Sequence, residues 1–219
     1  MEFQKVSIHK NPFIGLYFKA SERYLLSPRT MDQAIVENFC KTLQVEPISV
    51  LINQSNLMGV FAAMNSNGCI LPEFSEMPEE KALKEKGLNI MKIKHYSPGN
   101  NILCNDKAVL INPHIHKTTC KEIGDTLGVE VLQYQIAKTN PIGLVNFVTN
   151  TGLLANNNAK QEEVAKFKGF FKVKNAGNAT ANLGSHVGIS IVANSKGAMV
   201  GDLTSGIEMQ KIYEILSNE

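Results

Sequence analysis

The sequence predicts an α/β fold in which five copies of one supersecondary unit close into a propeller-like ring. The first observation behind this prediction is a glycine that follows an apolar residue and returns in steps of 40 to 45 residues. A period of about 20–50 residues is the signature of stacked or ring-arranged copies of one unit. The second observation is that the last copy lacks a strand, which the N-terminus supplies. The repeated glycines are Gly15, Gly59, Gly99, Gly143 and Gly188.

Each unit is predicted to begin with a β-hairpin. Beside the glycine, apolar residues alternate with others, as Ile14, Leu16 and Phe18 do in the first unit, and this period of two is typical of a half-buried strand. A turn rich in Asn, Ser and Gly follows, for example at 65–68, because Asn and Gly tolerate positive φ. A second short apolar run, such as 69–71, completes the hairpin.

A helix and a third strand are predicted after each hairpin. Capping residues and helical spacing of apolar residues predict helices over 30–43, 75–86, 114–127, 158–167 and 204–216. Strand-like runs follow at 48–52, 88–93, 129–134 and 170–174. The fifth unit ends at its helix, and residues 3–8 carry the missing alternating pattern.

We therefore expect a single domain over residues 1–219 that the N-terminal strand closes. The units are expected at about 9–53, 54–94, 95–136, 137–180 and 181–219, with residues 3–8 completing the last one. Closure of this kind leaves only short sheet edges exposed. The repeated glycines are expected where the ring is crowded, because Gly in a strand usually marks a close backbone approach.

Composition and charge exclude several classes of protein. Of the 219 residues, 43% are hydrophobic and 19% charged, without an apolar run of membrane-spanning length or an export signal. We expect a cytoplasmic monomer with no membrane partner. Arg23 and Arg29 are the only arginines, and base reading depends on bidentate arginine, so we expect no DNA partner. The cysteines are expected to be reduced core residues: Cys40, Cys69, Cys104 and Cys120.

Several stretches resemble the translation initiation factor 6 family in its archaeal form, whose members have the pentein fold, a five-bladed α/β propeller. The most specific is Gly99-Asn100 followed by Cys104-Asn105-Asp106, and the resemblance covers essentially the whole chain. The matching stretches are 67–72, 99–113, 129–131, 143–153 and 197–205.

The resemblance implies a protein that binds the large ribosomal subunit and sterically prevents its association with the small subunit, in translation initiation and subunit biogenesis. Contact with universal large-subunit ribosomal protein 14 near the sarcin–ricin loop is implied, with no catalysis and no cofactor. The residues that match family positions implicated in ribosome contact are Asn100, Val145 and His186. Each lies within two residues of a repeated glycine, so one binding face is expected.

Two other groups of residues have functional and structural interpretations. His114, His116, Cys120 and Glu122 include ligand types that Zn²⁺ prefers, but a fourth ligand is not evident and we expect no metal. Lysine clusters around 81–86 and 166–174 either contact ribosomal RNA phosphates or form solvated helix faces, the latter being the common case.

Two alternative functions remain compatible with the fold. Some penteins modify guanidino groups with a nucleophilic Cys near the C-terminus, and such a nucleophile needs a base within reach. The chain has no Cys after Cys120, although a pair such as Cys104 with His114 stays open. The other alternative is a ring that binds a protein partner unrelated to the ribosome.

Overall fold

The computed structural model describes residues 1–94, 97–184 and 186–217. The first unit comprises η1 (Ile14–Leu16), β2 (Lys19–Ala20), β3 (Tyr24–Pro28), α1 (Gln33–Leu43) and β4 (Glu46–Val50). The second comprises α2 (Met58–Phe61), β5 (Ala63–Met64), β6 (Gly68–Pro72), α3 (Met77–Glu85) and β7 (Asn89–Ile93). The third comprises α4 (Pro98–Asn101), β8 (Ile102–Cys104), β9 (Ala108–Ile111), α5 (Lys117–Leu127) and β10 (Glu130–Gln133).

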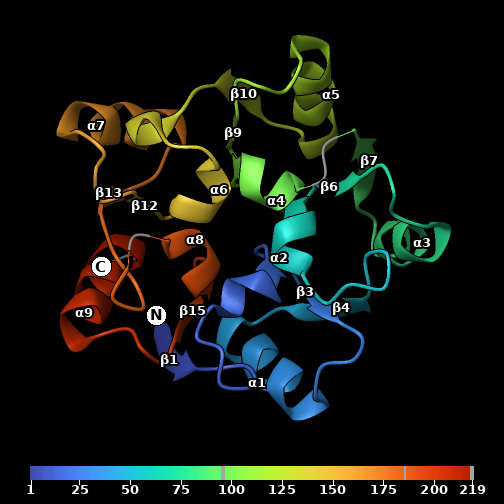
Figure 1. Ribbon diagram of the computed structural model, residues 1–219, viewed down its shortest axis with the longest axis horizontal. Helices are drawn as coiled ribbons and strands as arrows, with labels where there is room; N and C mark the ends of the chain where they lie inside the picture. The colour runs from blue at the N-terminus through green and yellow to red at the C-terminus, as the bar shows by residue number, and fades with distance from the viewer. Residues whose placement is uncertain (95–96, 185, 218–219) are drawn as a thin grey trace.

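The remaining units repeat this order. The fourth comprises η2 (Ile136–Lys138), α6 (Ile142–Val145), β11 (Phe147–Val148), β12 (Gly152–Ala155), α7 (Gln161–Phe170) and β13 (Asn175–Asn178). The fifth comprises α8 (Val187–Ser190), β14 (Ile191–Ala193), β15 (Gly197–Gly201) and α9 (Gly206–Leu216), and β1 (Glu2–Val6) supplies its third strand. The described residues thus form five three-stranded sheets around a central axis, with both chain ends in the fifth unit (Figure 1).

Each sheet has the same topology. The inner strand pairs antiparallel with the middle strand, as β2 does with β3, and the outer strand pairs parallel with the middle one, as β4 does with β3. A parallel neighbour requires a crossover connection, which the helix of each unit supplies. In the fifth sheet β1 pairs parallel with β15, with Phe3 opposite Ala198. The predicted closure by the N-terminal strand is confirmed.

The hydrophobic cores lie between neighbouring units. One core joins Ile48 and Val50 of the first sheet to Leu71 and Leu83 of the second unit. The core that closes the circle joins residues of β14 and β15 to the inner side of α1, including Val192, Met199, Phe39 and Leu43. Because every unit buries its apolar surface against the next, an open chain of units would leave one core exposed to water.

The repeated glycines occur where predicted, at the crowded centre, but in a different secondary structure. They lie in one-turn helices (η1, α2, α4, α6 and α8) that precede the inner strands, and not in the strands themselves. A Cβ built on Gly59 would overlap the carbonyl oxygen of Gly15, and Gly99 meets Gly59 in the same way. The same approach links Gly143 to Gly99, Gly188 to Gly143 and Gly15 to Gly188, which completes a ring of five glycines.

The turns between the first two strands connect neighbouring units. The side-chain amide of Asn65 donates to the carbonyls of Asn105 and Leu127 in the third unit, at 3.2 and 2.9 Å. Asn194 makes the equivalent pair of bonds to Ser21 and Leu43 across the closure of the ring, at 3.2 and 2.8 Å. The asparagines predicted only to form turns therefore also fix the spacing of the units.

The fourth unit differs from the prediction in its helix and third strand. The helix α7 begins at Gln161 and continues to Phe170, so residues 170–174 form its end and a turn, and the strand β13 starts at Asn175. The alternation of apolar and charged residues over 170–174 arises at the end of a helix and not in a strand. Phe167 and Phe171 are both buried in one core, which is helical spacing, and Lys172 adopts a left-handed φ of 52°.

Candidate functional site

The one-turn helices form one surface around the axis, which we call the short-helix face: η1, α2, α4, α6 and α8. In each helix the residue after the ring glycine is partly exposed on this face. These five residues are Leu16, Val60, Asn100, Leu144 and Ile189. Four are apolar and one is an amide, so these five positions form a mostly apolar ring that includes one amide. Apolar side chains that gather on an accessible surface mark a candidate interaction site.

Asn100 and Asn101 are neighbours in α4 with different roles. The Asn101 side chain is buried, donates to the Ser97 carbonyl at 2.9 Å and accepts from the Asn112 amide at 2.8 Å. Asn100 is partly exposed, and its side-chain amide makes no hydrogen bond within the described parts of the chain. Asn101 therefore serves the fold, whereas the amide of Asn100 is available to a partner.

The other two predicted contact residues differ in accessibility. His186 is exposed at the N-terminal end of α8, directly before the buried Val187. Val145 is only 4% exposed at the end of α6. The structure thus brings Asn100 and His186 to the accessible part of this face, and Leu144 is the accessible neighbour of Val145. A role of Val145 in partner contact stays a prediction.

The fifth unit carries an exposed apolar cluster that the sequence pattern does not predict, which we call the apolar corner. It consists of Leu183, Leu203 and Ile207, which are 75%, 57% and 84% exposed. The backbone N–H of Leu183 donates to the Glu208 carboxylate at 3.1 Å, which brings the 182–183 turn to the start of α9. The apolar spacing in 204–216 predicts Ile207 on the buried side of the helix, but α9 buries only later positions. Such exposure has no signal in a single sequence.

The loops leading into the short-helix face carry consecutive residues of left-handed conformation. In four described loops two adjacent residues other than glycine have φ values of 48° to 64°. The pairs are His9-Lys10, Asn53-Gln54, Ala137-Lys138 and Asn182-Leu183. Left-handed residues other than glycine are uncommon and concentrate at functional sites. In three of these loops a backbone N–H donates to a glutamate carboxylate of the next long helix. These glutamates are Glu79, Glu163 and Glu208.

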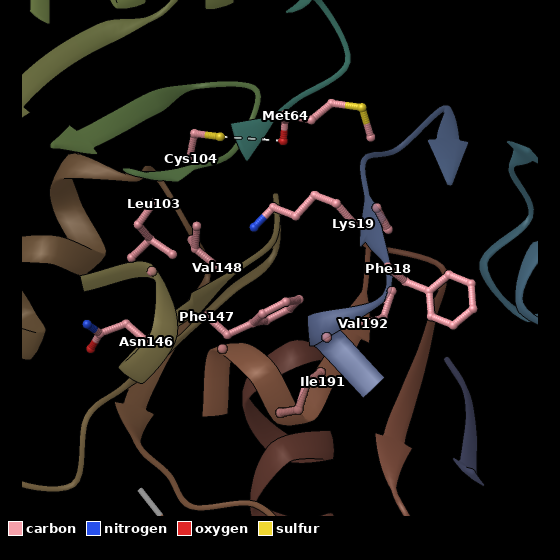
Figure 2. Close-up of a pocket in the computed structure, with 14 residues that line it drawn as sticks. Phe18, Lys19, Met64, Leu103, Cys104, Asn146, Phe147, Val148, Ile191 and Val192 are labelled. Carbon is pink, nitrogen blue, oxygen red and sulfur yellow. Dashed lines mark hydrogen bonds between the residues drawn. The ribbon is translucent and has the colours of Figure 1, made fainter. Parts of the chain in front are cut away.

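A small cavity lies on the ring axis, which we call the central channel (Figure 2). Its volume is about 20 Å³, and its lining comes from the inner elements of all five units. Lys19 extends into it from β2, toward Val148 and Leu103, and the Cys104 thiol donates to the Met64 carbonyl at 3.4 Å. No histidine and no carboxylate belong to its lining among the described residues. The Cys104 thiol therefore has neither a histidine nor a carboxylate beside it among the described residues that line the channel.

The cysteines lie in environments that suppress their reactivity. Burial raises the pKa of the Cys104 thiol to about 11, and burial also raises the pKa of Cys69. For Cys40, burial and then the nearby Glu37 raise the pKa to about 11. Burial raises the pKa of Cys120 as well. Since the thiolate is the nucleophile, these groups are poor nucleophiles near neutral pH.

Slow alkylation of the native protein is the expected consequence. With a pKa of about 11, only about one Cys104 thiol in a thousand is ionised near pH 8, so iodoacetamide should modify the folded protein far more slowly than the urea-unfolded chain. Mass spectrometry of both samples over time measures this. Rapid modification of one cysteine in the folded protein would contradict it and would restore the case for a catalytic thiol.

The residues considered for a metal site have other roles. His116 is the N-cap of α5, with its Nδ1 2.8 Å from the Thr118 hydroxyl. The Cys120 thiol donates to the Ile115 carbonyl. Within the part of the chain that the structure describes, no group of three or more His, Cys, Asp or Glu side chains is placed to hold a metal ion.

Several of the clustered lysines are paired with acids. Lys84 and Lys92 both bind the Glu80 carboxylate, at 3.3 and 2.9 Å, and these side chains hold its pKa below the usual range. Lys172 lies 3.9 Å from Glu130 in the neighbouring unit. These lysines lie at the surface, and each forms an ion pair with a nearby carboxylate. Among the described helices none is long and apolar enough to cross a membrane.

Comparison with known proteins places this architecture in a family. The sequence profile of the eIF-6 family matches residues 3–215. Translation initiation factor 6 of Thermoplasma acidophilum is 37% identical over 215 residues, covering 98% of this chain and 99% of that protein. The Pyrococcus horikoshii protein of the same name is 35% identical over 225 residues, covering 99% of each chain. That of Methanocaldococcus jannaschii is 36% identical over 214 residues, covering 94% and 93%.

A solved structure confirms the fold independently of close sequence similarity. A dimethylarginine dimethylaminohydrolase adduct with S-methyl-L-thiocitrulline superposes with a TM-score of 0.50 at 12% identity, over 98% of this chain and 85% of that one. At this identity the likeness concerns the fold alone, and it agrees with the predicted pentein arrangement of repeated three-stranded sheets. With its profile match and its archaeal relatives over nearly full length, the chain belongs to the eIF-6 family.

Proposed function

We propose that this protein is a translation initiation factor that binds the large ribosomal subunit through its short-helix face and sterically prevents joining of the small subunit. The observation that carries the proposal is the combination on one face of a partly exposed apolar ring, the unengaged amide of Asn100 and the exposed His186. Family membership supports the role in translation, because the relatives are named as translation initiation factors. The function requires no chemistry, in accord with the suppressed thiols.

The partner surface is proposed to be mostly protein. An apolar face with few charges suits a ribosomal protein better than an RNA backbone, because phosphate contacts depend on lysine and arginine. Universal large-subunit ribosomal protein 14, near the sarcin–ricin loop, is the partner that the family resemblance implies. Exposed lysines of the clusters around 81–86 and 166–174 are proposed to add contacts to ribosomal RNA phosphates. We propose that the apolar corner belongs to the same contact area, because its three side chains are exposed on the unit that carries His186.

Sedimentation tests the proposed function directly. The purified protein is centrifuged with isolated large and small archaeal subunits, and formation of joined ribosomes is then followed as the protein is titrated. Co-migration with the large subunit alone, together with a loss of joined particles, is the expected result. Binding to the small subunit, or binding to the large one without loss of joining, would overturn the steric mechanism.

Asn100→Ala is expected to weaken binding to the large subunit by about 5–30-fold while leaving the melting temperature unchanged. The loss arises because the partner group that the amide satisfies is left unpaired. Asn101→Ala is the matched control, since it removes the buried bonds to Ser97 and Asn112 and should lower stability by about 1–3 kcal/mol. Quantitative pelleting and thermal melts measure the two effects. Equal affinity of Asn100→Ala and the wild type would remove Asn100 from the site.

A further inference from the structure

The central channel contains a charge that the fold leaves without a counter-ion. The Nζ of Lys19 points into the cavity, and it forms no hydrogen bond or ion pair with the described residues. The side chain is only partly accessible, and desolvation by the surrounding protein lowers its pKa, with smaller opposing effects of Cys104 and Cys69. A buried ammonium without a partner is destabilising in any fold.

Two carboxylates, Asp106 and Glu22, line an adjoining hollow that shares Met64, Cys104 and Val148 with the channel, and both are committed to other groups. Asp106 accepts from the backbone N–H and the hydroxyl of Ser66 and from the Asn150 amide, at 2.8 to 2.9 Å. Glu22 accepts from the backbone N–H of Ser195 at 3.0 Å and from its hydroxyl. Both acids join neighbouring units of the ring, so neither is available to rotate inward toward Lys19.

The other polar groups of the channel are also engaged. The Cys104 thiol donates to the Met64 carbonyl, and its raised pKa keeps it uncharged beside the ammonium. The Asn146 amide donates to the Ile142 carbonyl at 2.8 Å, while its oxygen accepts from the backbone N–H of Asn156 at 2.8 Å. Lys19 therefore provides the only formal charge in the described lining, within walls that are otherwise apolar or satisfied.

We propose that the central channel is a binding site for one small monovalent anion, of halide size, held by the Lys19 ammonium. The volume of about 20 Å³ exceeds the roughly 10–15 Å³ that a single water molecule needs, and so small a space favours a monatomic anion over phosphate, sulfate or an organic acid. An anion at this position supplies the counter-charge that the chain does not. The site links strands from all five units, so its occupancy stabilises the closed ring without contributing to the partner surface.

The test compares bromide with gluconate, which is too large for the channel, in thermal melts at constant ionic strength and neutral pH. Bromide at about ten times its dissociation constant should raise the Tm of the wild type by about 3–5 °C relative to gluconate. Lys19→Met should show no such difference and should melt above the wild type in gluconate, because the unpaired charge is gone. Lys121→Met, which removes an exposed lysine of α5, is the control and should respond to bromide as the wild type does.

A pH series adds a second readout of the same site. Because the folded protein binds the Lys19 proton less tightly than the unfolded chain, unfolding takes up a proton between the lowered pKa and the usual value of 10.5. In gluconate, the stability contributed by this group should therefore rise as the pH increases through that interval. The bromide effect should disappear over the same range, since the neutral amine does not hold an anion.

Crystals of the wild type soaked in sodium bromide keep the proposal testable if Lys19→Met does not fold. An anomalous peak within contact distance of the Lys19 Nζ is the expected result. Bromide effects of equal size in the wild type and Lys19→Met, or a channel that contains water only and no anomalous peak, would overturn the proposal.

Discussion

Gly143→Ala is expected to lower the free energy of unfolding by about 3–5 kcal/mol, a large part of the roughly 5–15 kcal/mol that holds a domain folded. A Cβ on Gly143 would overlap the carbonyl oxygen of Gly99 and lie 3.0 Å from that of Ile102. Both obstacles are backbone, so no side chain can rotate away to relieve them. The third and fourth units must separate, and in a closed ring such a displacement disturbs the remaining contacts of the same kind.

Urea unfolding followed by circular dichroism measures this change, and Gly169→Ala is its control. Gly169 lies inside α7 with no atom within 4 Å of a built Cβ, so alanine there should be neutral or stabilising by up to about 1 kcal/mol. The two variants add the same methyl group to the same chain. Equal stabilities of Gly143→Ala and Gly169→Ala would show that close backbone approach at the centre does not limit the fold.

The repeats and the closure could be predicted because each depends on a local pattern that recurs. The alternation of residues 3–8 matches the third strand that the last unit lacks, and β1 pairs with β15 accordingly. The glycine spacing indicated crowding, but it could not show that the glycines lie in helical turns. A glycine beside alternating apolar residues fits a strand as well as a one-turn helix, and contacts with the neighbouring unit decide between them.

The candidate site was less accessible to sequence reasoning than the fold. Asn100 and Asn101 are adjacent residues of one type, and only the bonds of Asn101 to Ser97 and Asn112 show which of the two is structural. Val145 matches a family position, yet its side chain is only 4% exposed, which its place in the repeat does not predict. The Lys19 cavity also depends on five inner elements distant in sequence. The repeat period shows which residues occupy equivalent positions in the five units. Whether each of these side chains is exposed or buried depends on three-dimensional packing.

Ile8→Asp is expected to lower the free energy of unfolding by roughly 4–6 kcal/mol, enough to prevent folding of a marginally stable ring. Ile8 is fully buried in the core that joins the fifth sheet to α1, beside residues such as Val192 and Phe39. The substitution removes a large apolar side chain and places a carboxylate in the junction without a cation. Val6, at the end of β1, is only partly buried, so Val6→Asp should have a smaller effect in the same direction.

Ile207→Asp is the control for Ile8→Asp, because it makes the same substitution at a position outside the core that closes the ring. Ile207 is 84% exposed, so this variant should melt within about 0.5 kcal/mol of the wild type. It should nevertheless weaken binding to the large subunit if the apolar corner belongs to the proposed contact area. Urea unfolding of both variants supplies the comparison. If Ile8→Asp were as stable as Ile207→Asp, the N-terminal segment would be dispensable for the ring, and the five cores would have to be stable without the contact between the fifth and first units.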